Sequence, residues 1–238
     1  MGTGINNIGS GLSTLGQHYR MITNNIANAS TVGYKRQIRS MQQTAGTRSA
    51  AMGAGELQDN SSIDFGQGPA KHTGRPLDVA LHGPGMFAIE TPEGPVYTRN
   101  GVFHVNSDRQ IVDLAGQPVS GEAGPIVVPP DVPLMDVSIS RDGNVSAGGQ
   151  SIGKLKMVEF DDVNLLEPLS GASFRIGQAE EQAATKTTAQ QGFQEKSNVT
   201  TVEELVDLIT VTRLYEANLK GIKTQDNRMK SILQAAMA

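Results

Sequence analysis

The four histidines are the first residues to test for chemistry, because an imidazole can bind a metal ion or act as a general base. His18, His72, His82 and His104 are scattered along the chain. None stands in the His-x-x-x-His or His-x-Glu spacing that brings two ligands to one metal ion. The hydrophobic stripe around His18 runs along another side of the expected helix, which indicates a solvated side chain. The histidines therefore predict no metal site and no acid–base centre.

The other polar motifs also fall short of a site. The glycine-rich opening lacks the Gly-Lys-Ser/Thr ending of a phosphate loop, and no Gly-x-Ser-x-Gly elbow occurs. Residues 161–164 (DDVN) resemble a calcium loop without its central Gly and closing Glu, which favours a solvated turn. Asp78 lies in an apolar strand segment, either as a buried acid or as a charge on the outer face of an edge strand. We expect no enzyme, no cofactor and no metal.

Composition excludes further classes of protein. The chain has 238 residues, a net charge of −4 and no cysteine, and 37% of its residues are hydrophobic. An acidic chain is a poor ligand for nucleic acid or an anionic membrane, and without cysteine it forms no disulfide. No apolar run approaches the ~18 residues of a membrane span. No basic n-region or continuous apolar h-region opens the sequence, so we expect no cleavable secretory signal, and another exporter would have to carry the protein if it leaves the cytoplasm.

The N-terminal segment, residues 1–32, is predicted to be a long helix with one narrow apolar seam. The seam positions are spaced three and four residues apart, as in a heptad repeat. They are Ile5, Ile8, Leu12, Leu15, Tyr19, Ile22, Ile26 and Ala29. Polar residues fill the positions between them, and interior glycines weaken the helix by ~1 kcal/mol each. The helix therefore needs a partner that covers its seam.

The C-terminal segment, residues 200–238, offers such a partner, because its apolar residues recur at the same spacing. Its seam contains Leu205, Leu208, Thr212, Tyr215, Leu219, Ile222, Asp226, Met229, Leu233 and Ala236. At ~1.5 Å per residue the C-terminal helix would be roughly 54 Å long and the N-terminal helix about 40 Å long. Two such helices at opposite ends of a chain predict a coiled-coil stalk that carries an inserted body. The alternative is an ordinary helix pair within one compact domain.

The apolar seam residues are the predicted assembly interface, together with two asparagines near the end of the first helix. Asn25 and Asn28 have two interpretations that the residues leave equal: a polar contact line to a neighbouring subunit, or asparagines that cap the helix and face solvent. Gly33 is expected to take the left-handed conformation that closes the helix.

The residues between the helices predict an inserted β domain of an α+β fold. Residues 33–74 hold few large hydrophobic side chains, so we expect an extended arm that is disordered before assembly. From 75 to 180, short alternating segments separated by turn residues predict an antiparallel β-rich domain. The expected strands are 77–81, 86–90, 96–99, 101–105, 110–114, 125–128, 137–140, 144–146, 154–160 and 174–177. Residues 181–199, rich in Ala, Gln, Thr and Glu, are expected to be a second linker.

Three blocks of sequence resemble the rod and hook proteins of the bacterial flagellum. The N-terminal block is residues 24–36 (NNIANASTVGYKR). The middle block is 77–81 (LDVAL), 83–87 (GPGMF) and 97–101 (YTRNG), and the C-terminal block is 197–199 (SNV), 202–206 (VEELV) and 213–218 (RLYEAN). Within that family, residues 75–81 and 118–126 are most similar to a proximal-rod member, with the distal-rod type second.

The resemblance implies a structural subunit of the periplasmic rod, exported by the flagellar type III apparatus without cleavage of a signal peptide. Its terminal helices would pack with copies of itself and with other rod proteins above and below along the axis, while the 31–75 arm would become ordered on assembly. The rival class is a glycan- or peptide-binding β domain on a coiled-coil stalk. The four Tyr and six Phe of the chain are few for a ligand pocket lined by aromatic residues.

Overall fold

The computed structural model describes residues 2–41, 59–169 and 171–237. The chain forms two compact units. The first contains Met1–Ala27, Gln37–Ser62 and Thr200–Ala238, and the second contains Asn28–Arg36 and Ile63–Val199. The first unit is built on the two terminal helices and the second on antiparallel strands. The α+β fold with an inserted β domain is therefore confirmed.

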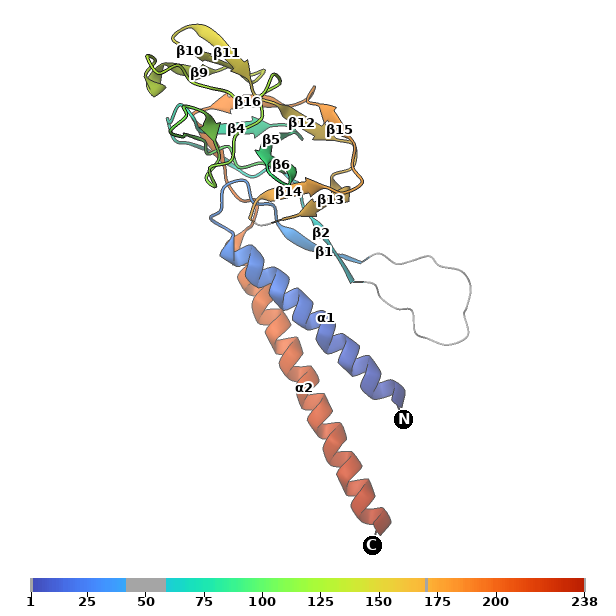
Figure 1. The fold of residues 1–238 in the computed structure, drawn as a ribbon. Helices are drawn as coiled ribbons and strands as arrows, with labels where there is room; N and C mark the ends of the chain where they lie inside the picture. The colour runs from blue at the N-terminus through green and yellow to red at the C-terminus, as the bar shows by residue number, and fades with distance from the viewer. Residues whose placement is uncertain (1, 42–58, 170, 238) are drawn as a thin grey trace. The chain divides into compact units, whose positions relative to one another are not determined.

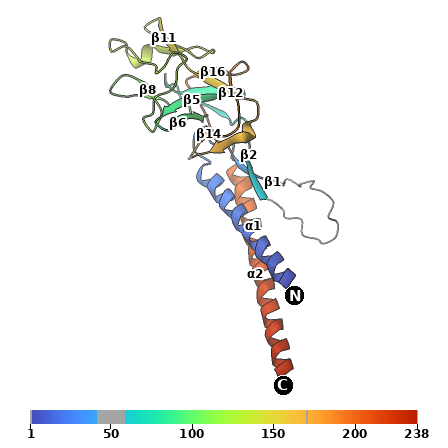
Figure 2. The ribbon, with the colours of Figure 1, turned by 45° about the vertical axis from the view of Figure 1, so that its right-hand side comes forward.

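The two helices of the first unit lie side by side. Helix α1 spans Gly2–Ala27 and helix α2 spans Thr201–Met237. They contact each other, and in both views they meet where α1 ends and α2 begins (Figures 1 and 2). They are antiparallel, because Asn25 in the last turn of α1 donates a hydrogen bond to Glu204 in the first turn of α2. The two terminal helices therefore contact each other within one chain.

Helix α1 ends earlier than the sequence predicts. The expected helix ran to residue 32, but a turn follows Ala27, in which the Thr31 amide donates to the Asn28 carbonyl at 3.0 Å. The Thr31 hydroxyl also donates to the Asn28 side-chain oxygen at 3.2 Å. Asn28 therefore shapes the turn, because an Asn side chain competes with the helical backbone for hydrogen bonds.

Two short strands complete the first unit. Strand β1 spans Gln37–Met41 and pairs with β2, Asp59–Ile63. Both fall within the segment expected to be an extended arm. The remainder of that expectation, for residues 42–58, lies outside the described residues.

The second unit consists of short strands and two 3-10 turns. The strands are β3 Ala70–His72, β4 Val79–His82, β5 Met86–Thr91, β6 Gly94–Thr98, β7 His104–Val105, β8 Ile111–Val112, β9 Val137–Ile139, β10 Asn144–Ala147, β11 Gln150–Lys154, β12 Met157–Phe160, β13 Leu166–Pro168, β14 Ser173–Ile176, β15 Glu181–Ala183, β16 Thr188–Gln191 and β17 Phe193–Glu195. The 3-10 turns are η1 Leu134–Asp136 and η2 Val163–Leu165. The largest sheet has six strands in the order β13-β14-β6-β5-β12-β15, and three strands pair as β11-β10-β9.

The two larger apolar clusters of this unit lie around Phe87 and Phe103 and around Tyr97 and Phe160, and a small third one contains Tyr34, Ala172 and Val199. Each pair of rings meets edge to face, with centroids 5.1 and 5.0 Å apart. Alternation explains how one strand serves both clusters, because neighbouring residues of β5 point to opposite faces of the sheet.

The segments expected to be linkers are strands of this β unit. Strand β17 pairs with β3, and β16 pairs with β4 in the register Ala189↔Leu81. Residues 63–74 and 181–199 thus hold each other in place through main-chain hydrogen bonds across more than a hundred residues of sequence. Their short, mostly polar strands carry no alternation strong enough to be seen from the sequence alone.

Two of the polar motifs have structural roles in the second unit. Asp78 is fully buried and accepts hydrogen bonds from the Thr73 hydroxyl at 2.6 Å and the Gln194 amide at 2.8 Å, so it is the buried acid of the two alternatives. Asp162 caps η2 by accepting from the Asn164 amide at 2.9 Å, as a turn residue does. Within the described ranges, no three His, Cys, Asp or Glu residues are grouped so as to hold a metal ion.

Candidate assembly interface

Helix α2 turns a partly polar stripe toward α1. Glu204 and Val211 are buried on it, at 1% and 3% exposure, and Leu208, Asn218 and Ile222 are half-buried. The predicted seam correctly included Leu208 and Ile222. In place of Glu204, Val211 and Asn218 it contained the residues that follow them in the sequence, Leu205, Thr212 and Leu219. The sequence missed this stripe because a pattern of hydrophobic residues passes over a glutamate and an asparagine, and polar contacts with α1 hold Glu204 in place.

The opposite side of α2 is apolar and exposed. Its large hydrophobic residues are between 45% and 70% exposed. They are Val202, Leu205, Val206 and Ile209. A run of exposed hydrophobic side chains on this scale marks an interaction surface in a soluble protein. This outward row of α2 is the strongest candidate for an assembly interface.

A groove of about 310 Å³ lies between the two helices. Leu15 and Tyr19 of α1 line it together with Val211 and Tyr215 of α2. Both tyrosines remain 41–45% exposed, so the helix pair leaves apolar surface uncovered even where the predicted seams meet.

Asn25 joins α1 to both of its neighbours. Its side-chain oxygen accepts from the Gln37 amide at 2.9 Å, and its side-chain nitrogen donates to the Gln37 carbonyl at 2.9 Å. The same nitrogen donates to Glu204 at 3.2 Å, and Asn25 and Glu204 are each 1% exposed. The amide of Asn25 therefore serves contacts within the chain.

The remaining predicted interface residues are divided between contact and exposure. Ile22 is buried at 1% exposure, and Leu12 and Ile26 are half-buried. Ile5, Ile8, Met229 and Leu233 belong to α1 and α2, and their side chains lie outside the described part of the structure. Of the exposed predicted residues, Leu205 lies on the outward row, Tyr19 and Tyr215 line the groove, and Leu219 lies elsewhere on α2.

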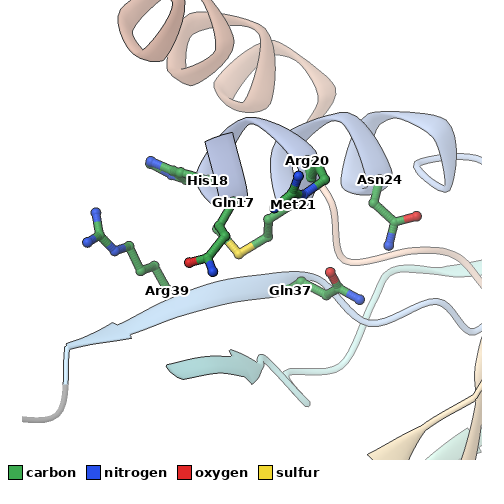
Figure 3. A pocket seen from close by; sticks show the side chains of 7 residues that line it. All are labelled: Gln17, His18, Arg20, Met21, Asn24, Gln37 and Arg39. Carbon is green, nitrogen blue, oxygen red and sulfur yellow. The ribbon is translucent and has the colours of Figure 1, made fainter. Parts of the chain in front are cut away.

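A second concave surface lies between α1 and β1, with a volume of about 550 Å³. Gln37 and Arg39 approach it from β1, and Gln17, Met21 and Asn24 from α1 (Figure 3). His18 and Arg20 complete its lining, and His18 is half-buried where the sequence predicted a solvated residue. We call this surface the α1–β1 cleft. No pattern in the sequence predicted this cleft, because β1 was not expected to be a strand.

The second unit contains a buried ion cluster that the sequence also did not reveal. The Lys35 ammonium lies 2.7 Å from Glu195 Oε1, and Arg99 Nη1 lies 3.4 Å from Glu195 Oε2. The Gly68 amide also donates to Glu195, at 3.0 Å. Burial lowers the pKa of Lys35, against the opposing attraction of Glu195. Three segments distant in sequence are therefore held together at one carboxylate.

Asn198 makes a similar connection near the end of the β unit. Its side-chain oxygen accepts from the Arg36 amide at 2.7 Å, and its side-chain nitrogen donates to the Asp64 carbonyl at 2.9 Å. The Arg36 carbonyl in turn accepts from the Asp64 amide at 2.8 Å. The three residues lie where the chain enters or leaves the unit, so Asn198 fixes these crossings relative to one another.

Comparison with known proteins matches all three parts of the chain. Residues 5–35 match the family described as "Flagella basal body rod protein". Residues 80–147 match "Flagellar hook protein FlgE/F/G D1 domain", and residues 190–235 match "Flagellar basal body rod FlgEFG protein C-terminal". The rod protein FlgG of Buchnera aphidicola subsp. Schizaphis graminum (strain Sg) is 32% identical over 94% of this chain and 96% of its own length.

The chain belongs to the flagellar basal-body rod FlgE/F/G family. Two FlgF rod proteins have about the same identity to it over somewhat less of the chain. That of Caulobacter vibrioides is 33% identical over 87% of this chain and 86% of its own length, and that of Escherichia coli K12 is 32% identical over 92% of each. The relatives do not separate FlgF from FlgG.

Family membership confirms three sequence predictions. The chain is a structural subunit and not an enzyme, and its place is the flagellar basal-body rod. Rod family membership also implies assembly with other rod subunits. Among the described helices, none is both long enough and apolar enough to cross a membrane.

Proposed function

We propose that this FlgE/F/G family member is a proximal-rod subunit of the FlgF type, which polymerises through its terminal helices into the drive shaft. The shaft transmits motor torque and encloses the export channel. The observation that carries this proposal is the outward row of α2, a face with four large hydrophobic side chains that are at least 45% exposed. Burying each such side chain completely is worth ~1.5–3 kcal/mol, so a partner helix on this row would bind strongly.

The same proposal names the interface and the partners. The interface is the outward row of α2 and the groove at Leu15, Tyr19 and Tyr215, which copies of the chain and other rod proteins along the axis would cover. The flagellar type III apparatus would export the chain without cleavage of a signal peptide.

The FlgF assignment has two supports. Residues 75–81 and 118–126 are most similar to the proximal type. The Caulobacter FlgF alignment covers 87% of the chain over 214 residues, whereas the Buchnera FlgG alignment needs 256 residues to cover 94%, so the FlgF relative aligns with fewer gaps. The second candidate is a FlgG-type distal-rod subunit, which the nearly complete coverage of FlgG relatives favours.

Locating a tagged copy in isolated basal bodies by electron microscopy tests this assignment. Label at the proximal end of the rod is the expected result. Label at the distal end would establish the FlgG-type alternative in its place. Basal bodies that carry no label, from cells in which the tagged copy restores motility, would overturn the rod function itself.

A further inference from the structure

The α1–β1 cleft lies in a part of the chain with a one-sided charge. No aspartate or glutamate precedes Glu56, whereas Arg20, Lys35, Arg36, Arg39 and Arg48 all do. Arg20 and Arg39 line the cleft, and its other polar groups include the side-chain amides of Gln17 and Gln37. Two guanidinium groups and several amides are suited to a carboxylate, because a guanidinium donates two parallel hydrogen bonds to its oxygens.

Arg20 is the residue on which recognition depends. It is exposed, and within the described part of the chain it has no ion pair. Arg39 has other contacts in its own chain, so it adds positive charge without being the primary donor. Met21 gives the cleft an apolar and adaptable wall. The cleft therefore offers a cation, amide donors and an apolar surface to a side chain that brings a carboxylate on a short stem.

Glu203 in the first turn of α2 has the complementary properties. It is exposed, and the residues three and four positions away on either side include no cation that could pair with it on the helix. Glu216 is the other exposed acidic residue in the described part of α2. It has Arg213 three residues before it and Lys220 four residues after it. Glu203 also lies between Val202 and Val206 of the outward row, so its neighbours are themselves expected to be covered.

Arg20 and Glu203 cannot pair within one chain. Arg20 lines the groove with Val211 and Thr212, eight residues or more along α2 from Glu203. At 1.5 Å per residue, that is about 12 Å of helix. Any ion pair between the two residues therefore joins different copies.

We infer that the α1–β1 cleft is a carboxylate-binding site that receives Glu203 from a second copy of this chain. This inference rests on the proposed rod function and names one contact through which copies recognise each other. The contact joins two different surfaces, the cleft of one copy and the start of α2 of the next. A heterologous contact of this kind leaves a free cleft and a free glutamate at the ends, and so it can extend into a helical polymer.

Charge reversal tests the contact in cells that lack the native copy. Arg20→Glu and Glu203→Arg are each expected to lower the amount of the chain in isolated basal bodies at least tenfold, which corresponds to about 1.4 kcal/mol. The double variant restores the opposite charges and is expected to recover most of that loss. Arg141→Glu changes the same charge at an exposed position of the second unit and serves as the matched control. A double variant no better than the single variants would overturn the inference.

The absence of cysteine from the chain permits a second, direct measurement. Arg20→Cys and Glu203→Cys, placed in separate copies with different tags, are expected to give a disulfide-linked dimer in oxidised basal bodies. Arg141→Cys with Glu203→Cys is the control pair and should give none. Should the Arg20→Cys and Glu203→Cys copies enter basal bodies without forming this dimer, the contact is wrong.

The two proposals fail in different ways. Wild-type chain in basal bodies, with charge-reversal variants that enter equally well, would reject the carboxylate site and leave the rod function standing. Wild-type chain that restores motility without entering basal bodies would reject the rod function, and the carboxylate site with it.

Discussion

Lys35 and Glu195 form an ion pair of 2.7 Å in which each side chain is 1% exposed. Arg99 shares the same carboxylate at 3.4 Å, so two buried cations depend on one anion. Lys35 lies at the end of the N-terminal block of residues 24–36, and Glu195 lies two residues before the C-terminal block that begins at residue 197. The pair thus joins the two ends of the β unit close to where the chain leaves for the helices.

The first prediction follows from this imbalance of charge. Glu195→Gln removes the only carboxylate in the cluster and leaves Lys35 and Arg99 buried without a counter-charge, a situation that costs about 3–5 kcal/mol. Lys35→Met leaves Glu195 paired with Arg99 and fills a similar volume, so it should cost much less. Thermal unfolding of the two variants measures the difference, and equal losses would contradict it.

Gly33 supplies a second prediction. It adopts φ +72°, and a Cβ atom there would lie 2.5 Å from the main-chain carbon of Arg99. Gly116 has a similar φ of +81° but open space around its Cβ position. Gly116→Ala should therefore show only the backbone strain of about 1–2 kcal/mol, whereas Gly33→Ala adds a clash with main chain. Unfolding midpoints that fall equally for both would show that the contact with Arg99 is unimportant.

The sequence predicted the elements that depend on local patterns and missed those that depend on residues far apart in the sequence. Heptad spacing predicted the helices, and alternation between turn residues predicted strands such as β5 and β9. Both signals are local in the sequence. The expected strand at 125–128 forms only an isolated bridge between Gln110 and Val127. Strands β16 and β17 were missed, because their partners lie more than a hundred residues away. These two strands are held by pairing with distant strands and by the buried charge of Glu195. Neither interaction leaves a local pattern in the sequence.

The candidate site was predicted in the same uneven way. Leu205 and Leu219 were identified as interface residues from their spacing, and they are exposed as an interface residue should be. Glu204 was passed over, because a glutamate in the contact stripe depends on Asn25, which lies at the other end of the sequence. The cleft residue Arg39 was missed for a related reason, since its position depends on a strand that hydrophobicity alone does not show.

Asn25 allows a third prediction about the helix unit. Asn25→Ala removes the partners of both the amide and the carbonyl of Gln37, and leaving such buried groups unpaired costs about 1–3 kcal/mol each. Asn25→Asp keeps the acceptor for the Gln37 amide but brings a carboxylate beside Glu204. Hydrogen exchange of the Gln37 amide should accelerate strongly in the alanine variant and less in the aspartate variant. The reverse order would contradict the assigned hydrogen bonds.

A fourth prediction concerns pH, through the hydrogen bond of 2.6 Å from the Tyr97 hydroxyl to Glu181. Burial acts to raise the pKa of Glu181, but hydrogen bonds from Lys156 and Tyr97 outweigh it and lower the pKa below its ordinary 4.5. The folded state therefore binds this proton less readily than the unfolded state does. The stabilisation is complete above pH 4.5 and is lost as the pH falls through the lowered pKa.

The partner of Glu181 titrates in the opposite sense. Burial, and then the hydrogen bond to Glu181, raise the pKa of Tyr97 above 10.0. Its contribution is complete below pH 10.0 and is lost as the pH rises through the raised value. Glu181→Gln should flatten the fall of the unfolding midpoint below pH 4.5, and Tyr97→Phe should flatten the fall above pH 10. Unchanged profiles in both variants would show that the pair does not govern either limit.

The last prediction separates assembly from folding. Leu205 is 45% exposed on the outward row of α2, and Leu114 is 64% exposed in the second unit. Leu205→Asp places a charge where a partner helix is expected, so it should abolish incorporation into basal bodies and motility while the β unit stays folded. Leu114→Asp makes the same chemical change outside the row and should leave both intact. Ile22→Asp is a poorer test, because Ile22 is 1% exposed and a charge there would disrupt the helix pair itself. Normal motility with Leu205→Asp would mean that the outward row faces solvent in the rod, and that another surface holds the copies together.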